Sequence, residues 1–520
     1  MRTRSIPNSN QVLPDNAAGI SGFAVSATTR RTGLVLLALG LGALIVTVMM
    51  LPKTSAALPG LVICGALGLV IWNALKLPLL PILRVALLAS FWFRLEINLF
   101  TLIKQGHETP VGLVISLNLL LNVLLLLAFL PTRSQGTVGS GVWPPAFTWT
   151  VGILVLCCLL SVMYGAETRL GLYALWWLMS ELLLCYVAAA YFRTERLLRQ
   201  VVICFAVAIL LNSLLGVLQY LDLFTGWEIV GATTGDRQMK IPGMEVSRAS
   251  GLLEAANSFG WALVSFSPVI LAPALLAKKE LPLWLRRLCV LAFFCGVVAL
   301  ILTFSRGSWM AFVLTLPVFA VFVLWALPAK ERGQMFIRLA GALVFLLVLG
   351  LPFLEPLSAR IFGDDEGAAE TRLPLMEVAA EMIRDRPFLG VGLSSYEAVM
   401  RRYDHTADFI TEHFPYPVHN MFLHVASEAG IPALLCLLTM VGIALHCGWK
   451  AWRRKEPEHS LPRALAGGLI IGMLAYLITA LKEPSSFDSG QIRNLFLLCG
   501  LLIGSECATR KQKTARSTQE

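Results

Sequence analysis

Long apolar runs recur along most of the chain and are separated by short polar segments. A helix of about 20 apolar residues crosses the hydrocarbon core of a bilayer, and most of these runs reach that length. The pattern therefore predicts an all-α polytopic membrane protein with about fourteen spanning helices. They are expected at 33–51, 57–75, 79–103, 111–131, 144–163, 170–192, 197–220, 257–277, 285–304, 307–328, 336–356, 430–448, 464–482 and 491–506.

The third run, 79–103, differs from the others because it contains three charged residues. Arg84, Arg94 and Glu96 must face protein, water or the membrane interface, since a bare charge in hydrocarbon is costly. This run is therefore expected either to span the membrane or to form a re-entrant or interfacial segment.

The composition supports a membrane protein and excludes several other classes. Hydrophobic residues make up 57% of the 520 residues, and charged residues make up only 14%. Soluble globular proteins have about 45–50% apolar residues and about 25% charged residues, so a soluble enzyme and a disordered scaffold are excluded. The net charge of +10 could suggest nucleic acid. In a membrane protein, however, Lys and Arg concentrate in cytoplasmic loops. We therefore expect contact with membrane lipid and no nucleic-acid partner.

Short basic loops predict the orientation. With a cytoplasmic N-terminus, the basic segments 193–199, 278–287, 330–332 and 450–455 all lie in the cytoplasm. The first 29 residues contain no apolar stretch, so we expect no cleavable signal peptide and a first span that is retained as an anchor.

This orientation divides the chain into segments of alternating location. They are a cytoplasmic N-terminal tail at 1–32, transmembrane helices at 33–220, an outer loop at 221–256, transmembrane helices at 257–356, a large outer loop at 357–429, transmembrane helices at 430–506 and a basic cytoplasmic tail at 507–520.

The large outer loop has a pattern typical of a small helical cap. Apolar residues at helical spacing predict a helix over 373–385, and Pro387 is expected to end it. A turn follows at 390–392, and Ser394 or Ser395 could cap a second helix that continues through Arg402. A third helix is expected to begin near Asn420 and to run into the next span.

Three arginines near the predicted outer face are candidates for an anion site. Arg306 stands in a Ser-Arg-Gly-Ser break between two apolar runs, where a bare charge needs a partner. Its planar guanidinium matches phosphate oxygens, and the helix that follows adds a positive N-terminal dipole. The alternative is an interfacial Arg that reaches lipid headgroups. Arg248 and Arg372 could complete a clamp for a polyanion, although each alone is typical of a solvated loop.

His419 is the main acid–base candidate, because it lies where the large outer loop should re-enter the membrane. An imidazole with a pKa of about 6.5 can accept a proton from a hydroxyl group. His405, His413 and His424 lie in the same loop without an assigned role. The acidic run 364–366 has no paired ligand motif, and the eleven Cys form no CxxC pair. We therefore expect no metal and no cofactor.

Four short motifs, taken in order, resemble the O-antigen ligase/polymerase superfamily of bacterial polysaccharide assembly. They are Arg248-Ala249-Ser250-Gly251 with Asn257, the segment from Thr303 to Trp309, Arg372 ahead of the segment from Arg386 to Gly392, and His419-Asn420 with Leu423, Glu428 and Gly430. The resemblance covers about residues 200–450. The chain has Ala256 where the family often has Pro, and Pro417 where it often has a further His.

The resemblance implies a C-type glycosyltransferase-like bundle of 12–14 helices with a helical periplasmic cap, in the bacterial inner membrane. It implies an undecaprenyl-diphosphate-linked glycan as donor and a glycan or lipid A–core as acceptor, with the active site on the periplasmic face. A chain-length regulator or a flippase would be a further partner. The residues implied as catalytic are Arg248, Arg306 and His419, and those implied as substrate-binding are Asn257, Arg372, Arg386 and Asn420. The reaction is expected to be metal-independent and inverting.

Two other classes remain as alternatives. A polysaccharide transporter or flippase would have inverted repeats, and the sequence contains no internal repeat. A protein O-oligosaccharyltransferase of the same superfamily often carries a C-terminal outer domain, whereas this chain ends in the basic tail. Between a ligase and a polymerase, the length and the number of spans favour a polymerase, since the ligases usually have twelve spans.

Overall fold

The computed structural model describes residues 79–93, 96–102, 111–134, 141–223, 238–241, 244–253, 255–362, 371–454, 460–487 and 490–517. The predicted spans 33–51 and 57–75 and the N-terminal tail lie outside these residues. In the described part, ten helices are long and apolar enough to cross a membrane, and all ten coincide with predicted spans. The prediction of a helical polytopic membrane protein is thereby confirmed.

Eight of these spans are single helices, one is broken at Gly430, and one continues through a short 3-10 turn. The helices are α5 (Pro145–Tyr164), α6 (Thr168–Tyr191), α7 (Glu195–Tyr220), α8 (Ala256–Leu276), α9 (Leu283–Leu302), α10 (Arg306–Ala326), α11 (Ala329–Gly350), α16 (Met421–Arg453), α17 (Leu461–Ala480) and α18 (Ile492–Ser517). The span that begins with α11 continues through η2 (Leu351–Phe353) into α12 (Leu354–Phe362).

The expectation that 79–103 crosses the membrane as one continuous helix is wrong, whereas the alternative of a re-entrant or interfacial segment stays a prediction. Helix α3 (Leu79–Ser90) covers only the first half of this range. Strand β1 (Glu96–Leu102) pairs antiparallel with β2 (Val111–Ser116), which replaces the start of the predicted helix at 111–131. Helix α4 (Leu117–Ser134) follows. Two side chains of α6 bind this hairpin: the Tyr173 hydroxyl donates to the Phe100 carbonyl at 2.6 Å, and the Trp176 indole donates to the Val114 carbonyl at 2.7 Å. The hairpin therefore depends on a distant helix.

A second hairpin lies in the loop between α7 and α8, where no strand was expected. Strands β3 (Gln238–Ile241) and β4 (Met244–Ser247) pair antiparallel and lead directly into the Arg248 segment. The fold is thus mainly helical with two small antiparallel hairpins, rather than strictly all-α.

The core of the bundle is formed by α8, α17 and α18. These helices are mostly buried, whereas the apolar span that begins with α11 is exposed along its length and suits contact with lipid. Gly468 and Gly472 of α17 face the backbone of Pro268 and Ser265 in α8, and a side chain at either glycine would clash with it. Small residues of this kind allow close helix packing in membranes.

A buried ion pair connects α6 with α18. Arg493 Nε donates to Glu181 Oε1 at 3.1 Å, and both side chains are almost fully buried. Because two long apolar helices each contribute one charge, the pair also sets their alignment. A charge of this kind inside a bundle is costly unless it is paired.

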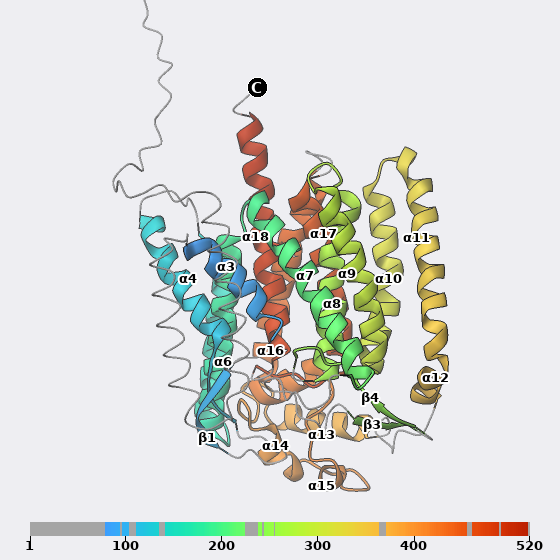
Figure 1. Ribbon diagram of the computed structural model, residues 1–520. Coiled ribbons are helices and arrows are strands. Elements are labelled where there is room, and N and C mark those ends of the chain that lie inside the picture. Colours follow the sequence, from blue (N-terminus) through green and yellow to red (C-terminus); the bar gives the residue numbers. More distant parts are fainter. Residues whose placement is uncertain are drawn as a thin grey trace, which may run out of the picture. The chain divides into compact units, whose positions relative to one another are not determined.

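The two ends of the bundle differ in their connections (Figure 1). Short turns join α6 to α7, α8 to α9 and α10 to α11 at the end of the bundle where α18 finishes, and α16 ends and α17 begins at this same end. The opposite end carries the β3–β4 hairpin and the interhelical segment, residues 371–420, with α13 (Arg372–Asp385), α14 (Tyr396–Val399), η3 (Met400–Arg402) and α15 (Ile410–His413). The helix expected at 373–385 is therefore present as α13.

Candidate functional site

Glu483 lies at the centre of a polar cluster at the end of the bundle that carries the interhelical segment. It belongs to the loop between α17 and α18. Asn257 Nδ2 donates to Glu483 Oε2 at 3.3 Å, and Asn257 Oδ1 accepts from Arg248 Nη2 at 2.6 Å. Arg248 Nε also donates to the Thr303 carbonyl at 2.8 Å. Residues from three loops and one helix thus meet at one place.

The backbone around Arg248 is held by Gln219 of α7. Gln219 Oε1 accepts from the Ser250 and Gly251 amides at 3.0 and 2.9 Å, and its Nε2 donates to the Gly251 carbonyl at 2.8 Å. Gly251 has φ +60°, a conformation that favours glycine. Asn212 Oδ1 accepts from the next amide, that of Leu252, at 2.9 Å. The Arg248 guanidinium is therefore presented by a rigid turn.

The beginning of α10 reaches the same cluster. Arg306 is the first residue of this helix and is partly buried. A Cβ atom on the neighbouring Gly307 would lie 3.3 Å from Glu483 Oε1, so only glycine allows the helix this approach without displacing the carboxyl group. Phe304 precedes the helix with φ 51°, a strained conformation for a non-glycine residue. The amides and positive dipole of α10 point to where an anion could bind.

Arg372 lies close enough to Glu483 and to His419 for its positive charge to act on both. It is the first residue of α13, and His419 lies two residues before the start of α16. The charge of Arg372 acts on the pKa values of both Glu483 and His419, which places its guanidinium near both groups. Asn257, Arg306 and Arg372 each lie at the start of a different helix, α8, α10 and α13.

His419 is a neutral imidazole at physiological pH. Its pKa is lowered to about 4, mainly by burial and further by the positive charge of Arg372. This differs from the expected value of about 6.5 for an unperturbed histidine. The physical reason is that the folded structure partly removes the imidazole from water and places the positive charge of Arg372 near it. The group can still bind a hydroxyl hydrogen, but charging it is unfavourable.

The pKa of Glu483 is shifted in the opposite direction, above its ordinary value. Burial raises its pKa to about 7, although Arg372, Arg248 and the hydrogen bond from Asn257 each favour the charged form. Groups with strongly displaced pKa values are concentrated at functional sites. The motifs drew attention only to residues 200–450, so Glu483 was missed. The available signal was an acidic residue followed by Pro484 just beyond the end of a span.

The interhelical segment is fastened to a break in α16 at Gly430, which has φ 86°. Val391 N donates to the Ser427 carbonyl at 2.8 Å, and Gly392 N donates to the Glu428 carbonyl at 3.0 Å. In return, Ile431 N donates to the Pro387 carbonyl at 2.8 Å. The turn at 390–392 thus satisfies backbone groups that the broken helix leaves free.

The Glu428 side chain connects this segment with the loop that carries Glu483. It is fully buried, and its Oε1 accepts from the Tyr396 amide at 3.3 Å, while its Oε2 accepts from the Ser486 hydroxyl. His424 Nε2 lies 3.6 Å from Glu428 Oε1. His424 is therefore part of a buried framework that holds the cluster, whereas His405 and His413 are exposed.

Replacing Gly390 with Ala should loosen this attachment. Gly390 has φ +66°, and an added Cβ would clash with the Glu428 carbonyl. Because both the strain and the clash act only in the folded state, we expect destabilisation of about 2 kcal/mol or more. Thermal unfolding in detergent and limited proteolysis of 371–420 would measure it. Gly442→Ala is the matched control, because that glycine in α16 has open space around it. Equal stability of both variants would contradict this role of Gly390.

Two of the expected site residues have other contacts. Asn420 caps α16, since its Oδ1 accepts from the Phe422 and Leu423 amides at 3.0 and 3.1 Å. Arg386 follows the end of α13, about 20 Å along the helix from Arg372. It is exposed and donates to the Tyr164 carbonyl at 3.4 Å. The structure therefore does not bring Arg386 to the Glu483 cluster.

Two further expectations concern capping and metal binding. Ser395 precedes α14 but makes no capping bond; its hydroxyl donates to the Leu393 carbonyl and accepts from the Glu167 amide. Among the residues that the structure describes, no three His, Cys, Asp or Glu side chains are arranged to hold a metal ion. The acidic run 364–366 lies outside the described residues.

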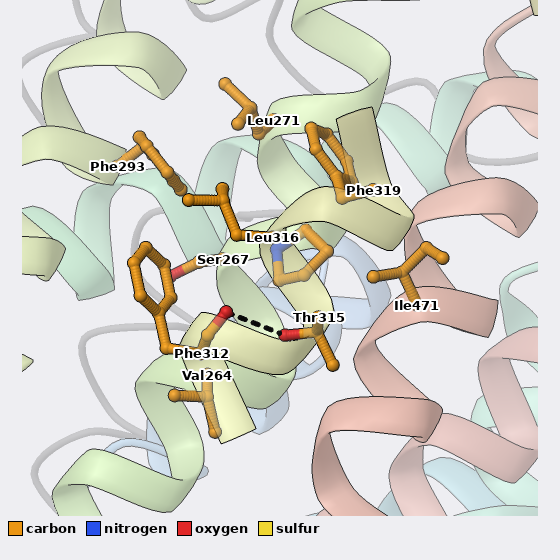
Figure 2. A pocket seen from close by; sticks show the side chains of 10 residues that line it. Val264, Ser267, Leu271, Phe293, Phe312, Thr315, Leu316, Phe319 and Ile471 are labelled. Carbon is orange, nitrogen blue, oxygen red and sulfur yellow. Dashed lines mark hydrogen bonds between the residues drawn. The ribbon is translucent and has the colours of Figure 1, made fainter. Parts of the chain in front are cut away.

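A small apolar pocket lies within the spans and not at this cluster (Figure 2). Residues of α8, α9, α10 and α17 line it, among them Phe293, Phe312, Phe319 and Ile471. Thr315, which donates to the Phe312 carbonyl at 3.3 Å, lies about 14 Å along α10 from Arg306. The pocket contains none of the charged residues and has no role in the chemistry that follows.

The comparisons concern the family of the chain and a range of its residues, and they assign no role to single side chains. No curated protein matches the chain. A family model described as O-antigen ligase matches residues 291–438, a stretch that contains Arg306, Arg372 and His419 but not Arg248, Asn257 or Glu483. The match confirms the resemblance of this chain to the O-antigen ligase/polymerase superfamily, whose members are membrane enzymes that transfer glycans.

Proposed function

We propose that this protein transfers a glycan from an undecaprenyl-diphosphate carrier to a sugar hydroxyl at the periplasmic face of the bacterial inner membrane. The observation that carries the proposal is the convergence of Arg248, Arg372 and the start of α10 around Glu483, with His419 beside Arg372. A C-type glycosyltransferase-like bundle, with residues 371–420 as its periplasmic cap, agrees with this arrangement.

The arginines suit the leaving group. When the glycan leaves its carrier, negative charge develops on the diphosphate, and preorganised donors that face this charge lower the barrier. Arg248, Arg306 and Arg372 would supply guanidinium groups, and the amides at the start of α10 would supply further donors. Because Arg248 is fixed by Asn257 and by the Thr303 carbonyl, it needs no reorganisation during the reaction.

His419 suits the acceptor. In a single displacement, the acceptor oxygen forms a bond to the anomeric carbon while the bond from that carbon to the phosphate oxygen breaks, so the configuration inverts. The proton of the acceptor hydroxyl passes to the neutral imidazole and then to solvent. Since the pKa of His419 is lowered to about 4, the imidazole would mainly orient the hydroxyl and take its proton late.

The placement of basic residues supports a periplasmic site. Lys and Arg are concentrated where α8 is followed by α9, where α10 is followed by α11 and at the end of α16, all at the end opposite the Glu483 cluster. Such loops favour the cytoplasm, which would leave the cluster on the periplasmic side. A lipid-linked donor could keep its apolar chain in the bilayer and present its diphosphate at this end of the spans.

The acceptor is best decided by deleting the gene and separating lipopolysaccharide and exopolysaccharide on gels. The number of spans favours a polymerase less than expected, because β1 and β2 pair where the third predicted span should end and the fourth should begin. Loss of all capped lipid A–core would indicate a ligase. Capping by a single repeat unit, or loss of a free polymer, would indicate a polymerase. Unchanged glycans in the deletion strain would overturn the proposed function.

A further inference from the structure

Glu483 places a carboxyl group inside a cluster that we propose to bind a diphosphate. The donors that surround it, Asn257 and Arg248 together with nearby Arg372, are the same donors that phosphate oxygens would use. A carboxylate and a diphosphate in one small site repel each other, because both are anions. One of the two must therefore change its charge or its position when the donor binds.

The groups that face Glu483 are mainly cationic. Arg248 comes from the turn before α8, Arg372 from the start of α13, and Arg306 stands next to Gly307 at the start of α10. Lys482 precedes Glu483 on its own loop. His419, beside Arg372, is neutral at physiological pH. A further acid of this framework, Glu428, binds Ser486 of the same loop.

Movement of the carboxyl group is restricted. Its Oε2 accepts from Asn257, and its Oε1 lies against the Gly307 backbone, where even a Cβ atom would come within 3.3 Å. The loop is also held through Ser486 by the buried Glu428. Protonation removes the repulsion without moving the side chain. It also gives Glu483 one O–H donor, while the other oxygen can still accept from Asn257.

We propose that Glu483 takes up one proton from solvent when a diphosphate binds, and that the resulting carboxylic acid donates a hydrogen bond to a phosphate oxygen. The inference rests on the proposed function, because it requires the cluster to bind a diphosphate. No bond to carbon or phosphorus changes in this step.

In the free protein, the pKa of Glu483 is already close to neutral pH. Burial raises the pKa of Glu483 to about 7, so the group is largely ionised at pH 8 before binding. The charge of a diphosphate would raise this pKa further. Binding then favours the protonated form, so affinity should fall as pH rises above 7, by up to about tenfold per pH unit for one coupled proton.

The experiment is titration calorimetry of the full-length protein in detergent with undecaprenyl diphosphate, at pH 8 in Hepes and in Tris. The two buffers differ in ionisation enthalpy, so the difference in measured heat gives the number of protons taken up. At this pH the phosphate groups themselves are mostly ionised, since their last pKa is about 6. We expect uptake close to one proton by the wild type. We expect almost none by Glu483→Gln, which keeps the shape of the side chain and should bind more tightly at pH 8.

The outcomes separate the inference from the function on which it rests. Diphosphate binding by the wild type without proton uptake at pH 8 overturns the role of Glu483, even if Glu483→Gln does not fold. Equal proton uptake by the wild type and by Glu483→Gln would also overturn the role of Glu483. Absence of binding by the wild type, or binding that is unchanged in Arg306→Ala, instead overturns the diphosphate site and therefore the proposed function.

Discussion

Replacing Arg306 with Ala is expected to lower the rate of glycan transfer by about 10²–10³-fold, the usual cost of removing one preorganised donor from a developing anion. Arg306 is the first residue of α10, next to Gly307, whose backbone lies against Glu483. Loss of the guanidinium should therefore remove stabilisation of the leaving diphosphate. The rate can be measured in membranes from a deletion strain that expresses the variant, and as recovery of the missing glycan on gels.

Two further variants make the Arg306 result specific. Arg306→Lys keeps the charge but loses the planar fork of donors, so we expect it to recover only part of the rate. Arg401→Ala removes an exposed arginine of η3 and should leave the rate unchanged. Normal amounts of Arg306→Ala protein in the membrane together with a wild-type rate would rule out the proposed role of Arg306.

Replacing His419 with Ala is expected to lower the rate by about 10²–10⁴-fold, the range typical of a positioned acid–base group. His419 is partly buried beside Arg372, so nearby water is a poor substitute for its imidazole. His405→Ala is the matched control, because His405 is exposed on the same interhelical segment. A rate that falls equally in both variants would point to disturbance of the segment and not to loss of the acceptor-binding group.

The pH dependence gives an independent check on His419. Since its pKa is lowered to about 4, the imidazole should remain neutral from pH 7.5 down to about 5.5, and kcat at saturating donor should not fall through a histidine titration in that range. An acidic limb of kcat with a midpoint near pH 6.5 would contradict this. Such a limb would mean that the group is exposed to water during turnover.

The spans could be predicted because the signal for each is contained in one stretch of sequence. Long apolar runs were sufficient to locate all ten described spans, and Asn420 was expected to begin a helix and does cap α16. The region 79–116 could not be predicted in this way. Its hairpin is held by Tyr173 and Trp176 of α6, which are distant in sequence.

The candidate site was likewise predictable from the sequence only in part. The residue types and order of Arg248, Arg306, Arg372 and His419 were sufficient to suggest an anion site with an acid–base group. The sequence could not show where these residues meet. Asn257 and Glu483, which hydrogen-bond to each other within the cluster, are 226 positions apart in the chain. Arg386 belongs to the same motifs, yet the length of α13 keeps it away from Arg372.

The sequence by itself determined that the chain is a helical membrane protein, where its described spans lie and which family it resembles, because hydrophobic length and short motifs are local properties. Only the tertiary structure decided that Glu483 lies among the arginines, that His419 is neutral and that Glu428 links the interhelical segment to the α17–α18 loop. The physical reason is that burial, charge proximity and hydrogen-bond partners depend on helices distant in the chain being packed together.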